Sequence, residues 1–277
     1  LQIQMERAPN TDYSARKQGR SYFTDEMIQR AKQNLQKYPD LETFLDLGGS
    51  QVLEMTEAQL WSYYPSWNVP RQCYSNWECP KCGEEIFQKS AFYPWQRMDE
   101  RFKLKCPVCG QVFPTNDYAN DDFSSGEYPD DGWGWDPTGG DRENVHAWVA
   151  HWNHHEAWKA GSFLTELGNR YLLADDEDAA HRAGVLLARI AYVYPGLNYR
   201  WQQPRTRYLG RSGRALVDGN WERNNFIIPA LKTYDAIYEH IDEDQELVEF
   251  LNEKDPTIQS PDDVKELIET HFVQLVG

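Results

Sequence analysis

The stretch CPKCGEEIFQKSAFYPWQRMDERFKLKCPVCG, residues 79–110, begins and ends with a CPxCG motif, and these motifs decide the fold around them. In each motif, the proline after the first cysteine and the glycine after the second favour a turn that directs two thiolates at one ion. Two such turns supply the four sulfurs of a closed tetrahedral site. We therefore expect a structural zinc ion, Zn²⁺, held by Cys79, Cys82, Cys106 and Cys109.

The residues between the two motifs alternate enough in polarity to form short strands, which predicts a zinc ribbon over residues 73–114. The alternatives are two disulfides or a redox CxxC. Pairing within one CPxCG turn is strained, and a thioredoxin-type motif does not usually occur twice in one chain. Cys73, the fifth cysteine, is interpreted as a buried thiol, with an exchange of Cys73 for Cys79 as ligand left open.

Composition limits the class of protein. The chain has 277 residues and 11 tryptophans, which indicates a globular protein. Its formal net charge of −16 argues against general nucleic-acid binding. No apolar run is long enough to span a membrane. Because the chain starts at Leu1, we expect a processed or excised product. The C-terminal HFVQLVG stops inside or just after an apolar helical pattern without an evident cap, so we expect the natural protein to continue beyond Gly277.

Cap residues and apolar periodicity predict a mainly helical chain. We expect a break near 159–162 in the longest helix, and Ser260 as the cap of the last one. The expected helices cover residues 24–39, 56–65, 145–174, 176–195 and 220–241, followed by two amphipathic helices towards the C-terminus. Paired helices with long connections suggest a partial (α/α) toroid carrying a small β zinc-ribbon insertion.

This pattern divides the chain into four parts. They are an N-terminal helical segment (1–72), the zinc ribbon insertion (73–114), an acidic loop rich in glycine, proline and tryptophan (115–142), and toroid helices that we expect to be truncated at the C-terminus (143–277). The acidic loop contains Trp133 and Trp135. Its carboxylates could hold Ca²⁺, but their spacing is not that of an EF-hand, so a solvated loop with two aromatic contacts is favoured.

The segment NYRWQQPRTRYLGRSGRALV, residues 198–217, concentrates arginine in an acidic protein. Its arginines are interleaved with aromatic residues, which can stack on sugar rings beside guanidinium groups that bind carboxylate or sulfate. A solvated connection paired with surface carboxylates is the alternative. The candidate contacts to an acidic glycan are Trp201, Arg205, Arg207 and Tyr208, together with Trp133, Trp135, His154 and His155.

The segment HAWVAHWNHHEAW, residues 146–158, places several histidines on one helix. His151 and His155 have the i, i+4 spacing that can bind a metal ion. The glutamate follows the pair, which does not match the HExxH motif of a zinc hydrolase. Partly buried histidines with aromatic neighbours are the favoured interpretation, with contact to a ligand at a cleft wall as the functional one.

Three segments together resemble heparinase II/III-like polysaccharide lyases. They are FTDEMIQRAKQNLQKYP (23–39), YLLADDEDAAHRAGVLLARIAYVYP (171–195) and GRALVDGNWERNNFIIPALKTYDAIY (213–238). Some members of that group carry a CPxCG insertion followed by text similar to FPTND (113–117) and DDGWGW (130–135), in this order. The resemblance covers most of the chain, and it rests on the order of the motifs and not on any single one of them.

The resemblance implies β-elimination on a uronic-acid-containing polysaccharide. An Asn, Arg or His neutralises the uronate carboxylate, a Tyr or His removes the C5 proton, and a Tyr protonates the leaving oxygen. The catalytic residues of the family have no match here and are expected beyond Gly277, so whether this chain alone is an enzyme is open. The resemblance implies a secreted or periplasmic protein that binds an acidic polysaccharide. The acidic net charge argues against nucleic acid as a partner, and the lack of a long apolar run argues against a membrane.

Two other functions stay open. A non-catalytic module could bind a glycan, a protein or a nucleic acid through the ribbon and the arginine-rich segment. A toroid glycoside hydrolase would need two carboxylates in a cleft, for which Asp218 and Glu222 are candidates, although their positions favour capping and flanking a helix.

Overall fold

The computed structural model describes residues 17–45, 51–67, 69, 77–91, 93–139, 145–197 and 223–276. These residues are mainly helical, with one small three-stranded sheet, which confirms the predicted class at this level. The chain divides into two compact units, described separately below. The helical unit comprises residues 1–64, 158–196 and 220–277, and the ribbon unit comprises residues 65–157 and 197–219.

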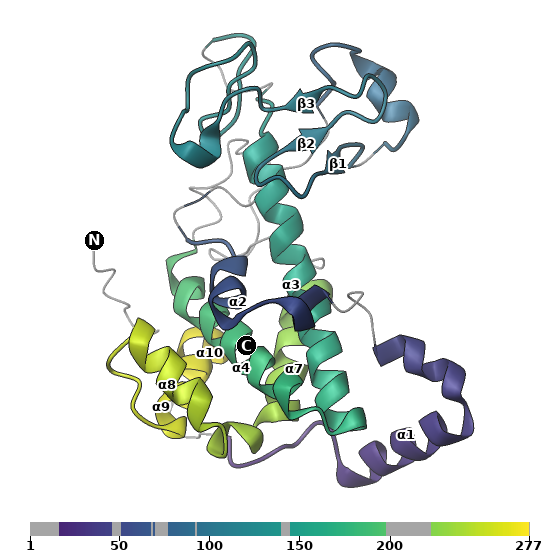
Figure 1. Ribbon diagram of the computed structural model, residues 1–277, viewed down its shortest axis with the longest axis vertical. Helices are drawn as coiled ribbons and strands as arrows, with labels where there is room; N and C mark the ends of the chain where they lie inside the picture. Colours follow the sequence, from purple (N-terminus) through teal and green to yellow (C-terminus); the bar gives the residue numbers. More distant parts are fainter. Residues whose placement is uncertain are drawn as a thin grey trace. The chain divides into compact units, whose positions relative to one another are not determined.

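The helical unit contains most of the helices (Figure 1). They are α1 (Asp25–Lys37), α2 (Glu57–Tyr63), most of α3 (Trp148–Ala174), α4 (Glu177–Val193), α7 (Ile228–Ile237), α8 (Gln245–Lys254), α9 (Pro261–Ile268) and α10 (Gln274–Val276). Two π-helical turns, Arg223–Ile227 and Glu269–Val273, precede α7 and α10. Short 3-10 segments lie at Pro39–Leu45, Gln51–Glu54, Tyr194–Gly196 and His240–Asp242.

Polar caps set the starts of these helices. Thr24 accepts a hydrogen bond from the N–H of Met27 at the start of α1, and Thr56 forms a capping box with Gln59 at the start of α2. Ser260 caps α9, as predicted. The helices predicted over 24–39, 56–65 and 176–195 are confirmed within a few residues, because their caps are encoded locally.

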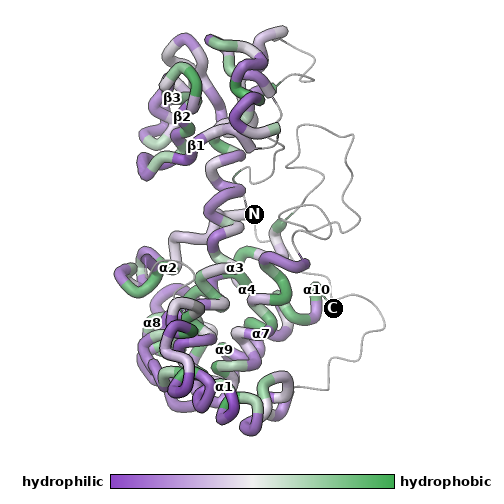
Figure 2. Tube along the Cα trace, turned by 90° about the vertical axis from the view of Figure 1, so that its right-hand side faces the viewer, coloured by the Kyte–Doolittle hydropathy of each residue, from purple (hydrophilic) through white to green (hydrophobic). Residues whose placement is uncertain are grey.

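Helix α4 forms the centre of the helical unit. It packs against α2, α7, α8 and α9, and eleven of its fifteen residues from Ala179 to Val193 are buried. Figure 2 shows α4 in the green of apolar residues, whereas α1 is mostly hydrophilic. Such burial is typical of a helix that is surrounded by other helices. The partial toroid itself stays a prediction.

The predicted break in the long helix near residues 159–162 is wrong, since α3 runs without interruption from Trp148 to Ala174. Gly161 lies within the predicted break, but there it permits close helix packing. A Cβ atom there would lie 1.9 Å from the carbonyl oxygen of Asn225. The π-helical turn therefore approaches α3 more closely than any side chain at position 161 would permit.

Asp235 fastens the N-terminal segment to α7. Its carboxylate accepts hydrogen bonds from the backbone N–H groups of residues 21–23 at 2.8 to 3.0 Å, and from Lys17 Nζ at 2.5 Å. Burial raises the pKa of Asp235, but these donors outweigh it and the pKa is lowered. Asp235, the aspartate of the TYD sequence at residues 233–235, thus has a structural role.

A second, partly buried network joins α2, α4 and α8 through His181. Its Nδ1 lies 2.9 Å from Asp244 Oδ2 and its Nε2 lies 3.0 Å from Glu57 Oε1. His240 approaches the same carboxylate at 3.7 Å. Burial lowers the pKa of His181, but hydrogen bonds and charges from Asp244 and Glu57 outweigh it and the pKa is raised. When it is protonated, His181 can donate to both carboxylates and so connects three helices.

This network predicts a pH-dependent stability. A raised pKa in the folded state means that the stabilisation is present below the ordinary histidine pKa near 6.5 and is lost as pH rises through the higher folded value. We expect the urea concentration at which half of the wild-type protein is unfolded to decrease as the pH is raised from 6 to 9. His181→Gln should remove most of that decrease. Asp178→Asn, at an exposed position on α4, is the matched control. An unchanged pH dependence in His181→Gln would contradict the prediction.

The ribbon unit contains the sheet. Its strands β1 (Gln96–Arg97), β2 (Leu104–Lys105) and β3 (Val112–Phe113) are antiparallel in the order β1-β2-β3, with Leu104 opposite Arg97 and Phe113. Short 3-10 segments lie at Glu84–Gln88 and Tyr118–Asn120. The strands predicted between the two CPxCG motifs are β1 and β2, and β3 follows the second motif.

Aromatic rings form the core of the ribbon unit. Trp148, at the start of α3, is fully buried and stacks on Phe113 with centroids 4.9 Å apart and on Trp135 with centroids 6.2 Å apart. Trp95 contacts Phe113 and Trp148 edge to face. The sheet is too small to stabilise itself, so its strands depend on this core and on the cysteine cluster.

Candidate functional site

The four cysteines of the CPxCG motifs come together. Cys79 Sγ lies 3.7 Å from Cys109 Sγ, and Cys82 Sγ lies 3.5 Å from Cys106 Sγ. All four sulfurs lie within 4.8 Å of one another, and none forms a disulfide. Four thiolates bound to one tetrahedral ion at about 2.3 Å would be about 3.8 Å apart. The cluster can therefore hold a metal ion with little rearrangement.

Two similar turns hold these sulfurs. The N–H of Gly83 donates to the carbonyl of Cys79 at 2.8 Å, and the N–H of Gly110 donates to the carbonyl of Cys106 at 3.0 Å. Both glycines have positive φ, 60° and 74°, which other residues rarely adopt. This explains the glycine after each second cysteine in physical terms.

The electrostatics of the cluster favour a cation. Burial raises the pKa of Cys79 to about 11. Burial and hydrogen bonds with Cys106 and Cys79 raise the pKa of Cys82. Four thiolates cannot coexist at neutral pH at these distances unless a positive ion compensates their charge. The donor set therefore fits a thiophilic divalent ion.

The DDGWGW sequence is organised by Asp130, which is fully buried. Its Oδ1 accepts hydrogen bonds from the N–H groups of Gly132 at 2.8 Å and Gly134 at 2.9 Å, and its Oδ2 accepts one from Val149 at 3.0 Å. Val149 lies in the first turn of α3, so one carboxyl group connects the loop to the helix N-terminus. Burial raises the pKa of Asp130 to about 7, although the three N–H groups act in the opposite direction.

Gly134 shows how tightly this loop packs. Its φ is 110°, and a Cβ atom would lie 2.1 Å from Val145 Cγ1. Trp135 pairs through its backbone with His146, with both N–H···O distances at 2.8 Å. The prediction of a solvated loop is therefore wrong for residues 130–135, because a buried carboxylate anchors them.

Trp133 and Trp135, both predicted to contact a glycan, are half-buried. Trp135 packs against the aromatic core, with Tyr128 edge to face at 5.0 Å in addition to Trp148. The backbone N–H of Trp133 donates to Asp131 at 2.8 Å. The packing of Trp135 accounts for its presence without a ligand.

The predicted histidines form a compact cluster on α3, which we call the histidine cluster: His151, His154 and His155, with Tyr93 packed on them. His151 Nε2 and His155 Nε2 lie 3.0 Å apart. The Tyr93 ring stacks on His151 with centroids 5.7 Å apart and on His154 with centroids 5.9 Å apart. Tyr93 has a φ of 54° and is 38% exposed. Non-glycine residues with such φ are uncommon and concentrate at functional sites.

Burial distinguishes the three histidines. His151 and His154 are buried, at 0% and 3% exposure, while His155 is half-buried. Burial, with the neighbouring histidines, lowers the pKa of His151 well below 6.5, and it lowers that of His154 to about 3. The buried imidazoles are thus neutral at physiological pH, and the nitrogen of a neutral imidazole can bind a metal ion.

The glutamate that follows these histidines, Glu156, forms an ion pair with the sheet. Glu156 is buried and pairs with Arg97 of β1, whose guanidinium lies over the Trp152 ring. The Nε1–H of Trp152 donates to the carbonyl of Met98 at 3.1 Å. Glu156 thus connects α3 to the sheet, which agrees with the sequence argument against an HExxH-type hydrolase.

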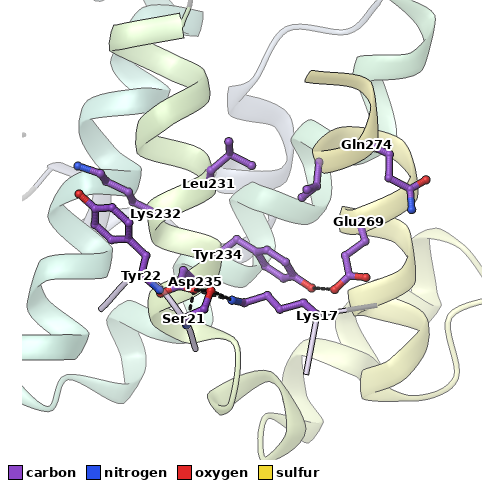
Figure 3. A pocket seen from close by; sticks show the side chains of 10 residues that line it. Lys17, Ser21, Tyr22, Leu231, Lys232, Tyr234, Asp235, Glu269 and Gln274 are labelled. Carbon is purple, nitrogen blue, oxygen red and sulfur yellow. Dashed lines mark hydrogen bonds and ion pairs between the residues drawn. The ribbon is translucent and has the colours of Figure 1, made fainter. Parts of the chain in front are cut away.

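The helical unit contains a cavity of about 400 Å³ between the N-terminal segment, α7 and the π-helical turn Glu269–Val273 (Figure 3). At its floor Tyr234 Oη donates to Glu269 Oε1 at 2.7 Å. On one side lie Lys17 and Asp235, which are already paired. The side chains that line it otherwise include Leu231 and Val273. Its polar groups are largely engaged in structural contacts.

The other predicted site residues lie outside the described residues. They are the glycan candidates Trp201, Arg205, Arg207 and Tyr208, the alternative ligand Cys73, and the carboxylates Asp218 and Glu222. Conversely, sequence reasoning missed Tyr93 and Asp130. Nothing in the sequence marks the backbone of Tyr93, whereas the DDGWG pattern, with two glycines after an aspartate, could have indicated an anchored turn.

Comparisons with protein-family models, with curated proteins and with solved structures found no match to this chain. Among the described helices, none combines the length and the apolar character needed to cross a membrane. The geometry of the cysteine and histidine clusters is therefore the basis for a functional assignment, together with the sequence motifs.

Proposed function

We propose that the four-cysteine cluster holds a structural zinc ion. Zinc is the usual ion of four-thiolate sites built from two CPxCG turns, and such a closed site leaves no position for water or substrate. Its expected role is to stabilise the ribbon, which the small sheet and the aromatic core position next to the start of α3. Catalytic chemistry must then come from other residues.

We further propose that the chain belongs to a secreted or periplasmic polysaccharide lyase that cleaves uronic-acid-containing glycans by β-elimination. The observation that carries this proposal is the stacking of the half-exposed Tyr93 on neutral histidines, beside His155. Neutral imidazole can hydrogen-bond a uronate or accept a proton, and a tyrosine ring can stack on a sugar or donate a proton. The motif order in the sequence supports the same class, and the partial toroid is part of the proposal.

In β-elimination, a base takes the C5 proton of the uronate, and the C–H electron pair forms the double bond between C4 and C5. The bond between C4 and the glycosidic oxygen breaks, and that oxygen takes a proton. We assign His155 and Tyr93 to contact the uronate residue, because they are the accessible members of the histidine cluster. The arginine-rich segment 198–217 would bind further carboxylate or sulfate groups.

Cleavage products test this function. The zinc-loaded protein is incubated with alginate, hyaluronan and heparan sulfate oligomers, and the products are analysed by mass spectrometry. A lyase produces an unsaturated end that is lighter by one water than a hydrolysis product. We expect His155→Ala to lower the rate by about a hundredfold, the scale of one acid–base or positioning contact, and His271→Gln in the helical unit to leave it unchanged.

Hydrolysis products would instead favour the glycoside hydrolase alternative. If no oligomer is cleaved, binding is measured by affinity electrophoresis with the same oligomers. Binding that depends on Tyr93 and His155 without cleavage would indicate a binding module or a chain that needs further catalytic residues. Absence of both cleavage and binding would contradict the proposal.

A further inference from the structure

His151 and His155 lie one turn apart on α3 with their Nε2 atoms facing each other at 3.0 Å. We propose that this pair is a binding site for a divalent transition-metal ion of the copper or nickel class, separate from the four-cysteine site. The inference goes beyond the proposed lyase function and does not depend on it.

The separation of the two nitrogens selects the ion. Imidazole nitrogens bind such ions at about 2.0–2.1 Å, so two nitrogens 3.0 Å apart subtend roughly 90–95° at the ion. That angle joins neighbouring positions of a square-planar or octahedral ion, which are the geometries of Cu²⁺ and Ni²⁺. A tetrahedral ion needs a separation of about 3.4 Å, so Zn²⁺ fits less well.

The two rings are arranged as a pair. Their centroids lie 4.5 Å apart, whereas the His154 ring lies 6.4 Å from His151 and 6.0 Å from His155. Among the described residues, the cysteine cluster is the one group of three or more potential ligands close enough for a common ion. The remaining positions on the ion would therefore be taken by water or solute.

Access and protonation set the expected affinity. His155 is half-buried, so an ion from solvent can reach the pair at this residue, whereas His151 is fully buried. In the free protein, one of the two Nε2 atoms carries a proton and donates it to the other in a hydrogen bond. A metal ion bound to both Nε2 atoms displaces this proton, which then moves to Nδ1 of the same ring. For His151, that Nδ1 has no hydrogen-bond partner within the described part of the chain. We therefore expect binding to be reversible.

The test uses the full chain with its cysteine site already saturated with zinc. Cu²⁺ binding is followed by pulsed electron paramagnetic resonance, where each copper-bound imidazole modulates the signal, and Ni²⁺ binding by calorimetry. Zinc release is monitored to show that the thiolates have not taken the added ion. We expect one Cu²⁺ per chain with two imidazole ligands, and His155→Gln to weaken binding by at least about tenfold.

His154→Gln is the matched control, because it changes a neighbouring buried histidine of the same helix and should leave Cu²⁺ affinity unchanged. His155 is the residue to change first, since substitution of the fully buried His151 can also disturb folding. Unchanged affinity in His155→Gln, a signal without two imidazoles, or an equal loss in His154→Gln would overturn the proposal. In those cases the pair is a hydrogen bond only, or the ion binds elsewhere.

Discussion

Cys106→Ser is expected to abolish metal binding and to unfold the ribbon unit. The wild-type chain should contain about one equivalent of zinc, and the variant close to none, because three thiolates and a hydroxyl hold zinc far more weakly. Structural zinc sites contribute on the order of 10 kcal/mol to folding at neutral pH. The small sheet of β1, β2 and β3 cannot replace that stabilisation. The measurements are elemental analysis and near-ultraviolet circular dichroism, which reports the packed tryptophans.

Cys73→Ser is the matched control, since the four close sulfurs of the described residues belong to the CPxCG motifs and Cys73 lies in neither motif. It should keep its zinc and its spectrum. Cobalt substitution adds an independent readout, because a tetrahedral four-thiolate site gives intense visible absorption bands. A metal-free wild-type ribbon that keeps its fold, or loss of zinc in Cys73→Ser, would contradict the assignment. The second result would indicate that Cys73 replaces one of the four ligands.

Asp130→Ala should strongly destabilise the ribbon unit. It leaves three backbone N–H groups, those of Gly132, Gly134 and Val149, without their acceptor in a buried position. An unsatisfied buried donor costs about 1–3 kcal/mol, so we expect a loss of about 3 kcal/mol or more. Asp130→Asn keeps one acceptor oxygen but turns its amide towards the N–H of Val149, and should lie between wild type and alanine.

The exposed neighbour Asp131, whose carboxylate accepts a hydrogen bond from the N–H of Trp133, provides the control. Asp131→Ala should cost no more than about 1 kcal/mol. Unfolding in urea measures the free energies, and amide hydrogen exchange at Gly132, Gly134 and Val149 localises the effect. Equal losses for Asp130→Ala and Asp131→Ala would show that the buried anchor does not organise the loop.

Several features of the fold were predictable because their causes are local. Helices α1, α2, α4 and α9 begin at a threonine, aspartate or serine cap, and a cap acts within one turn of its own residue. The CPxCG turns were predictable for the same reason, since proline and glycine restrict or extend the backbone angles of a few residues. The four ligands were predicted from spacing alone, and the structure brings them together.

The errors share one cause, which is contact between distant segments. Gly161 favours a helix break by its own propensity, but α3 continues because the glycine admits the carbonyl of Asn225. The acidic loop looked solvated, yet Asp130 is buried because the start of α3 supplies a donor from another part of the chain. Local propensity cannot report such partners.

The sequence by itself determined the helical class, the helix starts and which four cysteines come together, because caps, periodicity and turn residues act over a few positions. Only the tertiary structure decided that His151 and His155 face each other with Tyr93 stacked on their helix, and that Asp130 joins a loop to that helix. Distances between side chains depend on burial and on packing from remote segments, and these are properties of the folded chain as a whole.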